Sequence, residues 1–247
     1  MYPLVKKELN LSTRPFYKPK KLNRTRMQAP FFKNISKDQL RNHMHCAKLC
    51  KDVYFHKHDL VVDVRDNHMY VAVEGTHTLT NWVDNVSVFF KNNDVHPGFE
   101  RYAEYCAIEY NPFSDLSSVD TLFISGHSSG AASVALLAYN LARDLKVRDE
   151  ENKCVVELVL FGCPKIGGSD FKFRFNEACH NMEIFNYRNN GDMICTIPYS
   201  SMGYHDTFGE DDTRLLDAPN KPWWDVTNHF MASYIESLEN LGINEST

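Results

Sequence analysis

The chain has 247 residues, of which 43% are hydrophobic, 13% aromatic and 24% charged, and its formal net charge is −5 at pH 7. This composition is typical of a folded globular protein and excludes a fibrous, low-complexity or largely disordered chain. No stretch reaches the roughly 18 consecutive apolar residues of a membrane span, and the first residues lack the apolar core of a secretory signal. We therefore expect an intracellular protein. The seven cysteines, an odd number in a long chain, are expected to be mostly reduced.

Residues 1–30 form a basic arm. Eight lysines and arginines against a single glutamate give this segment a net charge of +7, which leaves −12 for the rest of the chain. Four prolines interrupt the segment, so we expect an extended arm rather than one continuous helix. Contact with the acidic body of its own or a neighbouring subunit, with an anionic membrane surface, and with nucleic acid all stay open for the arm itself.

The remaining residues, 31–247, contain no segment that reads as a linker, and we expect them to form a single domain. No further basic surface with interleaved aromatic residues follows the arm, so no nucleic-acid partner is expected. Peripheral contact with a lipid surface stays open, and the oligomeric state is not predicted.

The body alternates helical and strand patterns. Helical spacing of apolar residues covers 37–54, and two β-rich runs at 60–64 and 69–73 flank a short polar turn, which predicts a hairpin. Further elements follow in alternation. Strands are expected at 121–125, 155–161 and 183–188, and helices near 97–109, 129–143, 169–179 and 228–241. This order predicts an α/β fold with a mostly parallel central sheet flanked by helices.

Histidines and cysteines gather in and just after the first predicted helix. A metal site is one interpretation, but ligand pairs of firm spacing are absent. Buried cysteines on the helix and histidines on a surface turn are the favoured interpretation, and neither a metal nor an organic cofactor is expected. The residues concerned are His43, His45, Cys46, Cys50, His56 and His58.

Ser128 is the residue that points most directly to chemistry. It lies at the centre of the pentapeptide 126–130 (GHSSG), between an apolar strand pattern and a helical run. A serine in this position occupies a strained turn, and glycines two residues to either side remove the Cβ atoms that would collide there. The turn predicts an exposed nucleophile, with the backbone N–H of Ser129 and the positive end of the helix beside it.

A serine nucleophile needs a histidine to accept its proton and an acid to orient that histidine. Asp192 follows a predicted strand across the turn 189–191, which places it on the same sheet edge as Ser128. His229 arrives late in the chain, at the start of the last predicted helix, and His205 is the competing candidate. Position alone leaves the choice between the two histidines open.

Five blocks of sequence resemble, in order, the motifs of the class 3 (fungal-type) lipase family. They are 73–76 (VEGT), 95–99 (VHPGF), 124–132 (ISGHSSGAA), 160–167 (LFGCPKIG) and 192–198 (DMICTIP). Tyr234 after His229 resembles the closing pair of that family. The resemblance runs from about residue 70 to 235 and excludes the basic arm.

The resemblance implies an α/β-hydrolase fold and a catalytic triad of Ser128, Asp192 and His229, which decides against His205. It also implies that Thr76 supplies the second oxyanion-hole donor beside Ser129. Ser129 stands where the family has leucine, which makes the expected pocket wall more polar. That departure weakens the case for long triacylglycerols as substrates.

Between Thr76 and the second block the family carries its lid. In this chain the apolar residues of that segment fall at i, i+3, i+4 and i+7, which predicts a helix with one apolar face. We expect a mobile cover over the site, with a helix packed permanently on the body as the alternative. The residues of this face are Leu79, Trp82, Val83 and Val86.

The expected function is a serine carboxylic ester hydrolase, a lipase or esterase that cleaves acyl esters of lipids through an acyl-enzyme. A phospholipase or an acyltransferase on the same triad is the first alternative. A lipase-like scaffold that binds without catalysis, as in the plant immune lipase-like proteins that the family also resembles, is the second.

Overall fold

The computed structural model describes residues 35–56, 58–75, 94–148, 154–217 and 225–244. Their centre is a six-stranded sheet in the order β1-β2-β3-β4-β5-β6, so that neighbours in the sheet are neighbours in the chain. Only β1 runs against the others; β2 to β6 are parallel. The strands are β1 (Leu60–Arg65), β2 (His68–Val73), β3 (Thr121–His127), β4 (Val155–Phe161), β5 (Glu183–Asn189) and β6 (Thr213–Leu216).

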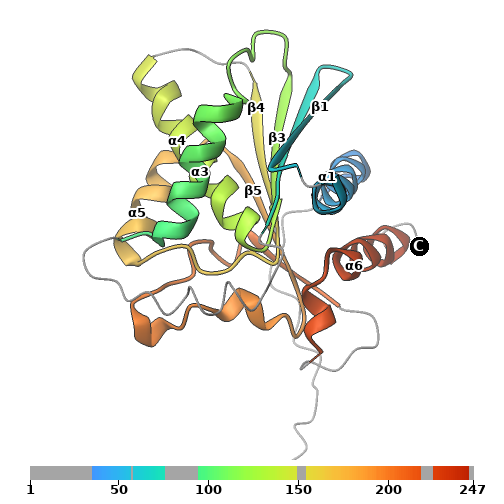
Figure 1. The fold of residues 1–247 in the computed structure, drawn as a ribbon. Coiled ribbons are helices and arrows are strands. Elements are labelled where there is room, and N and C mark those ends of the chain that lie inside the picture. Colours follow the sequence, from blue (N-terminus) through green and yellow to red (C-terminus); the bar gives the residue numbers. More distant parts are fainter. Residues whose placement is uncertain (1–34, 57, 76–93, 149–153, 218–224, 245–247) are drawn as a thin grey trace, which may run out of the picture.

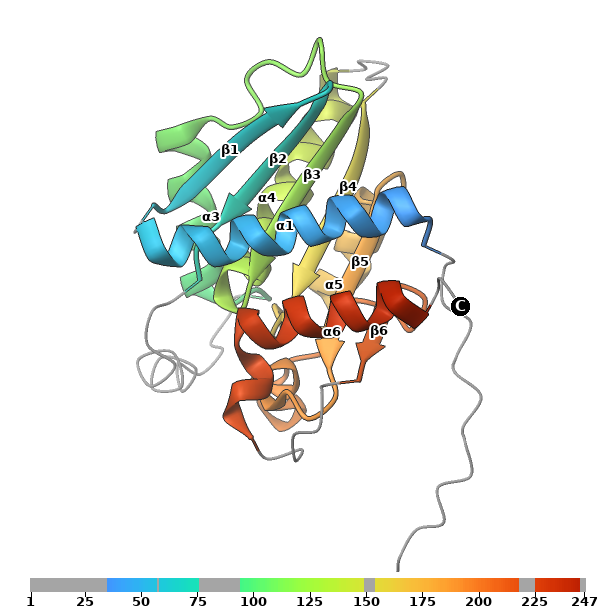
Figure 2. The same ribbon diagram turned by 90° about the vertical axis from the view of Figure 1, so that its right-hand side faces the viewer.

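Helices cover both faces of the sheet (Figure 1). The three that connect successive parallel strands lie on one face, as right-handed crossovers in a sheet of sequential order require. They are α3 (Pro97–Tyr110), α4 (Ser129–Arg148) and α5 (Ser169–Ala178). The first and last described helices, α1 (Lys37–His56) and α6 (Met231–Asn244), lie side by side across the other face (Figure 2).

Each face of the sheet has its own apolar core. The face under α3, α4 and α5 buries aliphatic residues such as Leu122, Ile124 and Leu160. The face under α1 and α6 buries several aromatic residues, among them Phe123 and Phe161, together with aliphatic ones. Because both faces are covered, β3 and β4 read as nearly continuous apolar runs rather than alternating ones.

The hairpin predicted at 60–73 is present, with β1 and β2 joined at Asp66 and Asn67. These two residues have φ of 49° and 61°. Positive φ at both central residues is the signature of the type I′ turn, which matches the twist of the flanking strands, and asparagine and aspartate tolerate it. This turn makes β1 the antiparallel edge strand of the sheet and places β2 between β1 and β3.

The histidines and cysteines considered as metal ligands are used otherwise. His43 is a fully buried residue of α1, and its ring nitrogens lie 2.7 Å from Tyr187 Oη and 2.8 Å from Glu157 Oε2. Cys46 and Cys50 are buried, as predicted, while His56 and His58 stack at the exposed end of α1. Across the described residues, no group of three or more histidine, cysteine or acidic side chains is arranged to hold a metal ion.

The predicted elements that fall on described residues are confirmed with boundaries shifted by a few residues, apart from the C-terminal region. The last predicted helix, 228–241, was wrong at its start, because Val226–His229 forms a 3₁₀ turn, η3, and α6 begins only at Met231. Strand β6 was not predicted, and two further 3₁₀ turns, η1 (Met193–Thr196) and η2 (Ser200–Met202), follow β5. The basic arm lies outside the described residues. None of the helices described is both long enough and apolar enough to cross a bilayer.

Candidate active site

Ser128 lies in a strained turn between β3 and α4. Its φ is +59°, a left-handed conformation that costs a non-glycine residue about 1–3 kcal/mol. Backbone hydrogen bonds hold the turn: Ser128 N–H donates to Phe161 O at 3.0 Å, and Ser128 O accepts from Ala131 N–H at 3.0 Å. The turn therefore carries the side chain of Ser128 at the carboxyl edge of the sheet.

The two glycines around Ser128 are required by close backbone approach. A Cβ on Gly126 would lie 2.6 Å from the carbonyl group of Gly130, and a Cβ on Gly130 would lie 2.7 Å from Val73 O and Glu74 O. Both distances are shorter than folded proteins allow, so larger residues would push α4 away from β2 and β3. With glycine, α4 starts at the buried Ser129, directly after the nucleophile candidate.

The ring of His229, 101 residues further along the chain, contacts Ser128. Its Nε2 lies 2.8 Å from Ser128 Oγ, and its Nδ1 lies 2.8 Å from Asp192 Oδ2. His229 is the last residue of η3, a turn that starts at the N-cap Asp225. The three side chains thus form one hydrogen-bonded line, and all three are buried.

Gly162, the residue after β4, makes room for this line. Its φ is +61°, and a Cβ there would lie 3.0 Å from both Asp192 Oδ2 and His229 Cε1. A side chain at position 162 would therefore press on the acid and on the imidazole together. The strained conformation and the close approach both favour glycine.

Asp192 is held at both carboxylate oxygens. Oδ1 accepts the backbone N–H of Ile194 at 2.9 Å, while Oδ2 accepts the Tyr234 hydroxyl at 2.6 Å beside its contact with His229. Burial alone would raise the pKa of Asp192, but these hydrogen bonds and the charge of His229 outweigh it and lower the pKa below its ordinary value. Asp192 is therefore a fixed carboxylate.

The ring of His127 packs beside the ring of His229. Its ring centroid lies 4.7 Å from that of His229, and its Nε2 lies 2.6 Å from the carbonyl oxygen of His229. Burial, together with the neighbouring His229, lowers the pKa of His127 to about 3. His127 is therefore a neutral imidazole at the pH of ordinary assays.

This burial predicts a loss of stability in acid. The unfolded chain binds a proton on His127 below about pH 6.5, whereas the folded chain does so only near pH 3, so stability falls as the pH drops between these values. The slope is about 1.4 kcal/mol per pH unit. Urea unfolding at pH 6.5 and 4.5 should show His127→Gln losing about 2–3 kcal/mol less than the wild type over that interval. Equal losses in both proteins would contradict the assignment.

The other candidates fall into two groups. His205, the rival of His229, is exposed and pairs through its backbone with Gly167, so the structure does not bring it to Ser128. Thr76 and the four residues of the predicted lid face, Leu79, Trp82, Val83 and Val86, lie outside the described residues. Ser129 stands at the first position of α4, where the helix itself supplies no acceptor for the backbone N–H groups.

Three participants were missed by the sequence reasoning. Tyr54, from α1, hydrogen-bonds to His127 at 3.0 Å. Asn189, at the end of β5, donates to Asn228 O at 2.8 Å and its N–H donates to Tyr234 Oη at 3.1 Å. Gly162 had a usable signal, because a glycine directly after a buried strand suggests a turn at the sheet edge. The two polar residues had none, since only the fold brings them near.

A mostly parallel sheet with a serine on the turn after a central strand, and an imidazole and a carboxylate converging on it, defines the α/β-hydrolase class of serine hydrolases. The predicted fold class is thereby confirmed. The model of one family, "Lipase (class 3)", matches residues 70–202. The chain belongs to the class 3 lipase family.

A curated relative agrees with this family assignment, and solved structures share the fold. Phospholipase A1-II 5 from Oryza sativa subsp. indica is 30% identical over 188 residues, which cover 63% of this chain and 39% of that protein. The chain thus spans about two fifths of the relative's length. Among solved structures, the native Rhizomucor miehei lipase propeptide complex has a TM-score of 0.56 at 14% identity, covering 82% of this chain and 80% of that one. Lipase II from Rhizopus niveus has a TM-score of 0.55 at 15% identity, covering 78% and 94%.

Proposed function

We propose that this chain is a serine carboxylic ester hydrolase that cleaves acyl esters of lipids through an acyl-enzyme on Ser128. The observation that carries the proposal is the buried line of two 2.8 Å contacts, from Ser128 Oγ to His229 and from His229 to Asp192. The body from residue 31 onward would act as one catalytic domain, with residues 1–30 as an appended arm. No step requires a metal or an organic cofactor.

In the first half of the reaction, Ser128 Oγ attacks the ester carbonyl carbon while His229 Nε2 takes the hydroxyl proton. Asp192 accepts the Nδ1–H of His229, which fixes the ring tautomer and stabilises the imidazolium. His229 then returns the proton to the leaving alcohol as the tetrahedral intermediate collapses. Water repeats the sequence in the second half and releases the carboxylic acid.

The negative oxygen of each tetrahedral intermediate needs two donors. We assign the backbone N–H of Ser129 as one, because it opens α4 and adjoins the nucleophile. Thr76, three residues beyond the last residue of β2, is the proposed second donor. Residues 79–86 would form the cover of the site.

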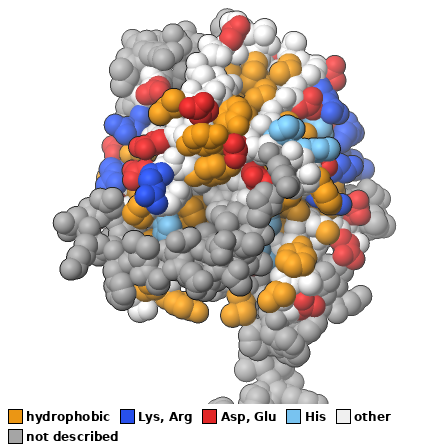
Figure 3. Space-filling view, in the orientation of Figure 1, with side chains coloured by type: hydrophobic (Ala, Val, Ile, Leu, Met, Phe, Trp, Pro, Cys, Tyr) orange, Lys and Arg blue, Asp and Glu red, His pale blue; other side chains and the backbone are white. Residues whose placement is uncertain are grey.

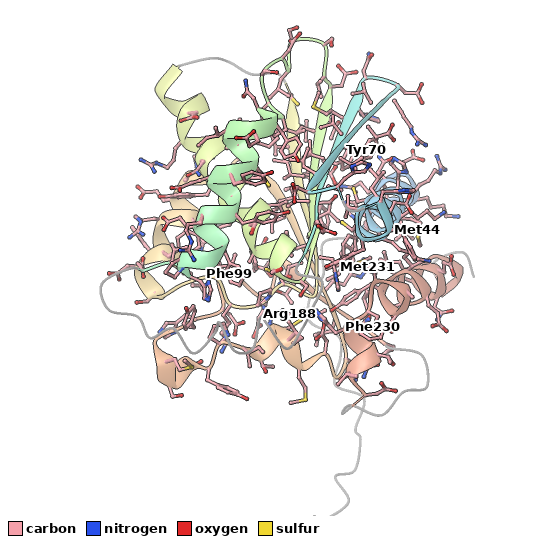
Figure 4. The ribbon with its side chains drawn as sticks, viewed as in Figure 1. Met44, Tyr70, Phe99, Arg188, Phe230 and Met231 are labelled. Atoms are coloured by element: carbon pink, nitrogen blue, oxygen red, sulfur yellow. The ribbon has the colours of Figure 1, made fainter. Side chains whose placement is uncertain are left out.

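Exposed apolar side chains beside the triad support a lipid-like substrate. Met193 follows Asp192 in η1, and Val226 and Phe230 flank the turn that carries His229; they are 55%, 69% and 47% exposed. Figure 4 labels Phe230 where η3 meets α6, below the carboxyl edge of the sheet, and Figure 3 shows hydrophobic side chains along this lower part of the molecule. Such a rim would rest on an aggregated lipid substrate.

Phe230→Ser should therefore weaken hydrolysis of lipid vesicles more than hydrolysis of a dissolved ester. Full burial of an apolar side chain is worth about 1.5–3 kcal/mol, and partial insertion of about 1 kcal/mol corresponds to about a fivefold loss. The matched control is Ile108→Ser, 77% exposed on α3 near the opposite edge of the sheet. An equal effect of both variants on vesicles would contradict the lipid-facing role of the rim.

A second candidate, hydrolysis of the acyl ester of a phospholipid, is favoured by the 30% identity to phospholipase A1-II 5. Product analysis separates the proposal from this candidate. Phospholipids and glycerides serve as the ester substrates, and alcohols as acyl acceptors.

Labelling tests whether the chain is an enzyme at all. An alkyl fluorophosphonate should stop hydrolysis of p-nitrophenyl butyrate and leave an adduct that peptide mass spectrometry places on Ser128. A folded protein that never reacts would overturn the proposal and support the non-catalytic scaffold.

A further inference from the structure

His127 is a buried titratable group, next to the triad, that takes no part in the proposed reaction. It directly precedes Ser128 in the chain, and its ring contacts the backbone of His229. Both of its ring nitrogens are engaged, Nε2 at 2.6 Å from His229 O and Nδ1 at 3.0 Å from Tyr54 Oη.

The partners of His127 determine its tautomer. A carbonyl oxygen only accepts, so in the neutral ring Nε2 carries the hydrogen and donates it to His229 O. Nδ1 is then the acceptor, and the Tyr54 hydroxyl donates to it. The direction of the chain of hydrogen bonds is therefore set: Tyr54 to His127, and His127 to the carbonyl group of His229.

This series of hydrogen bonds ends on His229, the residue whose position the proposed reaction depends on most. His229 must keep its two ring nitrogens within 2.8 Å of Ser128 and of Asp192 at the same time. Its ring is carried by a short 3₁₀ turn rather than by a long helix, so local backbone hydrogen bonds alone hold it weakly. Asn189 donates a hydrogen bond to the carbonyl oxygen of Asn228, and His127 donates one to the carbonyl oxygen of His229.

Tyr54 also reaches the end of β2. The backbone of Gly75 hydrogen-bonds to the Tyr54 hydroxyl, and a Cβ at position 75 would collide with that oxygen. Gly75 directly precedes Thr76, the proposed second oxyanion donor. The Tyr54 hydroxyl thus contacts both His127, which hydrogen-bonds to His229, and Gly75, which precedes the proposed oxyanion donor.

We propose that Tyr54 and His127 are positioning residues. They fix His229, the proposed base, and Gly75, which precedes the proposed oxyanion donor, relative to each other. This inference rests on the proposed function. Tyr54 comes from α1, upstream of the segment that matches the family model, so the active site depends on a helix outside that segment.

The test compares four variants of the full chain in hydrolysis of p-nitrophenyl butyrate. Tyr54→Phe removes the hydroxyl and should lower kcat about tenfold, with KM nearly unchanged, because a displacement of about 1 Å costs up to about 10²-fold. His127→Leu removes the donor to His229 and should lower kcat about 100-fold. His127→Gln keeps an N–H donor and should recover most of the lost kcat.

The fourth variant, Tyr70→Phe, is the matched control. Tyr70 Oη also donates from the sheet side to α1, at 3.1 Å from Asn42 Oδ1, but lies away from the site (Figure 4). Its kcat should equal that of the wild type, while urea unfolding gives losses of stability similar to those of Tyr54→Phe. The rate of fluorophosphonate labelling should follow kcat in all four variants.

The outcomes separate the two proposals. If the wild type hydrolyses the ester and is labelled on Ser128, while Tyr54→Phe and His127→Leu keep its kcat, the positioning role is wrong and the proposed function stands. The role is also wrong if kcat falls only in proportion to the loss of folded protein, or if Tyr70→Phe falls equally. A folded wild type that neither reacts nor hydrolyses overturns both proposals.

Discussion

Replacing Ser128 with alanine is expected to lower kcat/KM for p-nitrophenyl butyrate by about 10³- to 10⁶-fold and to abolish fluorophosphonate labelling. The variant keeps the Cβ and removes only the oxygen that lies 2.8 Å from His229 Nε2. With no nucleophile in the protein, any residual turnover would come from water held by the remaining site. Steady-state kinetics and intact-protein mass spectrometry measure the two effects.

The fold should survive this change, because alanine fits the same turn with a φ of +59° as well as serine does. The control is Ser237→Ala, which removes a buried hydroxyl that bonds within α6 at 2.9 Å from Ser233 O, far along the helix from His229. Its kcat/KM should stay near that of the wild type. Turnover by Ser128→Ala within tenfold of the wild type would rule out Ser128 as the nucleophile.

The second large effect is expected for Asp192→Asn, with kcat lowered about 10⁴-fold. The amide keeps the shape of the carboxylate but loses the charge, and its N–H₂ group can face His229 Nδ1, which favours the wrong tautomer of the ring. Because the pKa of Asp192 lies below its ordinary value, the carboxylate stays ionised through the acidic limb of the rate profile. Kinetics between pH 5 and 9 provide the measurement.

Tyr234→Phe serves as the comparison for Asp192→Asn. It removes the hydroxyl that donates at 2.6 Å to the same carboxylate oxygen, but leaves the charge and the contact with His229 in place. Its loss of kcat should be much smaller than that of Asp192→Asn. If the two variants lost activity equally, the charge of Asp192 would not be what matters at this position.

Much of this architecture can be predicted from the sequence, because local patterns carry it. The turn at Ser128 is announced by its two glycines, and the hairpin by Asp66 and Asn67 between two β-rich runs. The sequence also singled out Asp192 and His229, which the fold brings into line with Ser128. The central strands β3 and β4 also stand out in the sequence as nearly continuous apolar runs, since both faces of the sheet are covered.

The parts that escaped prediction depend on long-range packing. Strand β6 has only four residues, so its pairing with β5 decides it rather than its own propensity. His229 was placed in a helix because helical spacing continues through the residues that form η3. Tyr54 looks like any apolar position of α1, and nothing local shows that its hydroxyl meets His127.

The placement of α1 bears on how this protein can be truncated. A fragment chosen to begin where the match to the lipase family model begins, at residue 70, would lack α1 and the first strand of the hairpin. It would remove the α1 residues that pack on Phe123, His43 among them, and leave His127 without the hydroxyl of Tyr54. The shortest active fragment must therefore start upstream of Lys37 so that it includes α1. None of the residues assigned to bond making or breaking lies in α1 or before it.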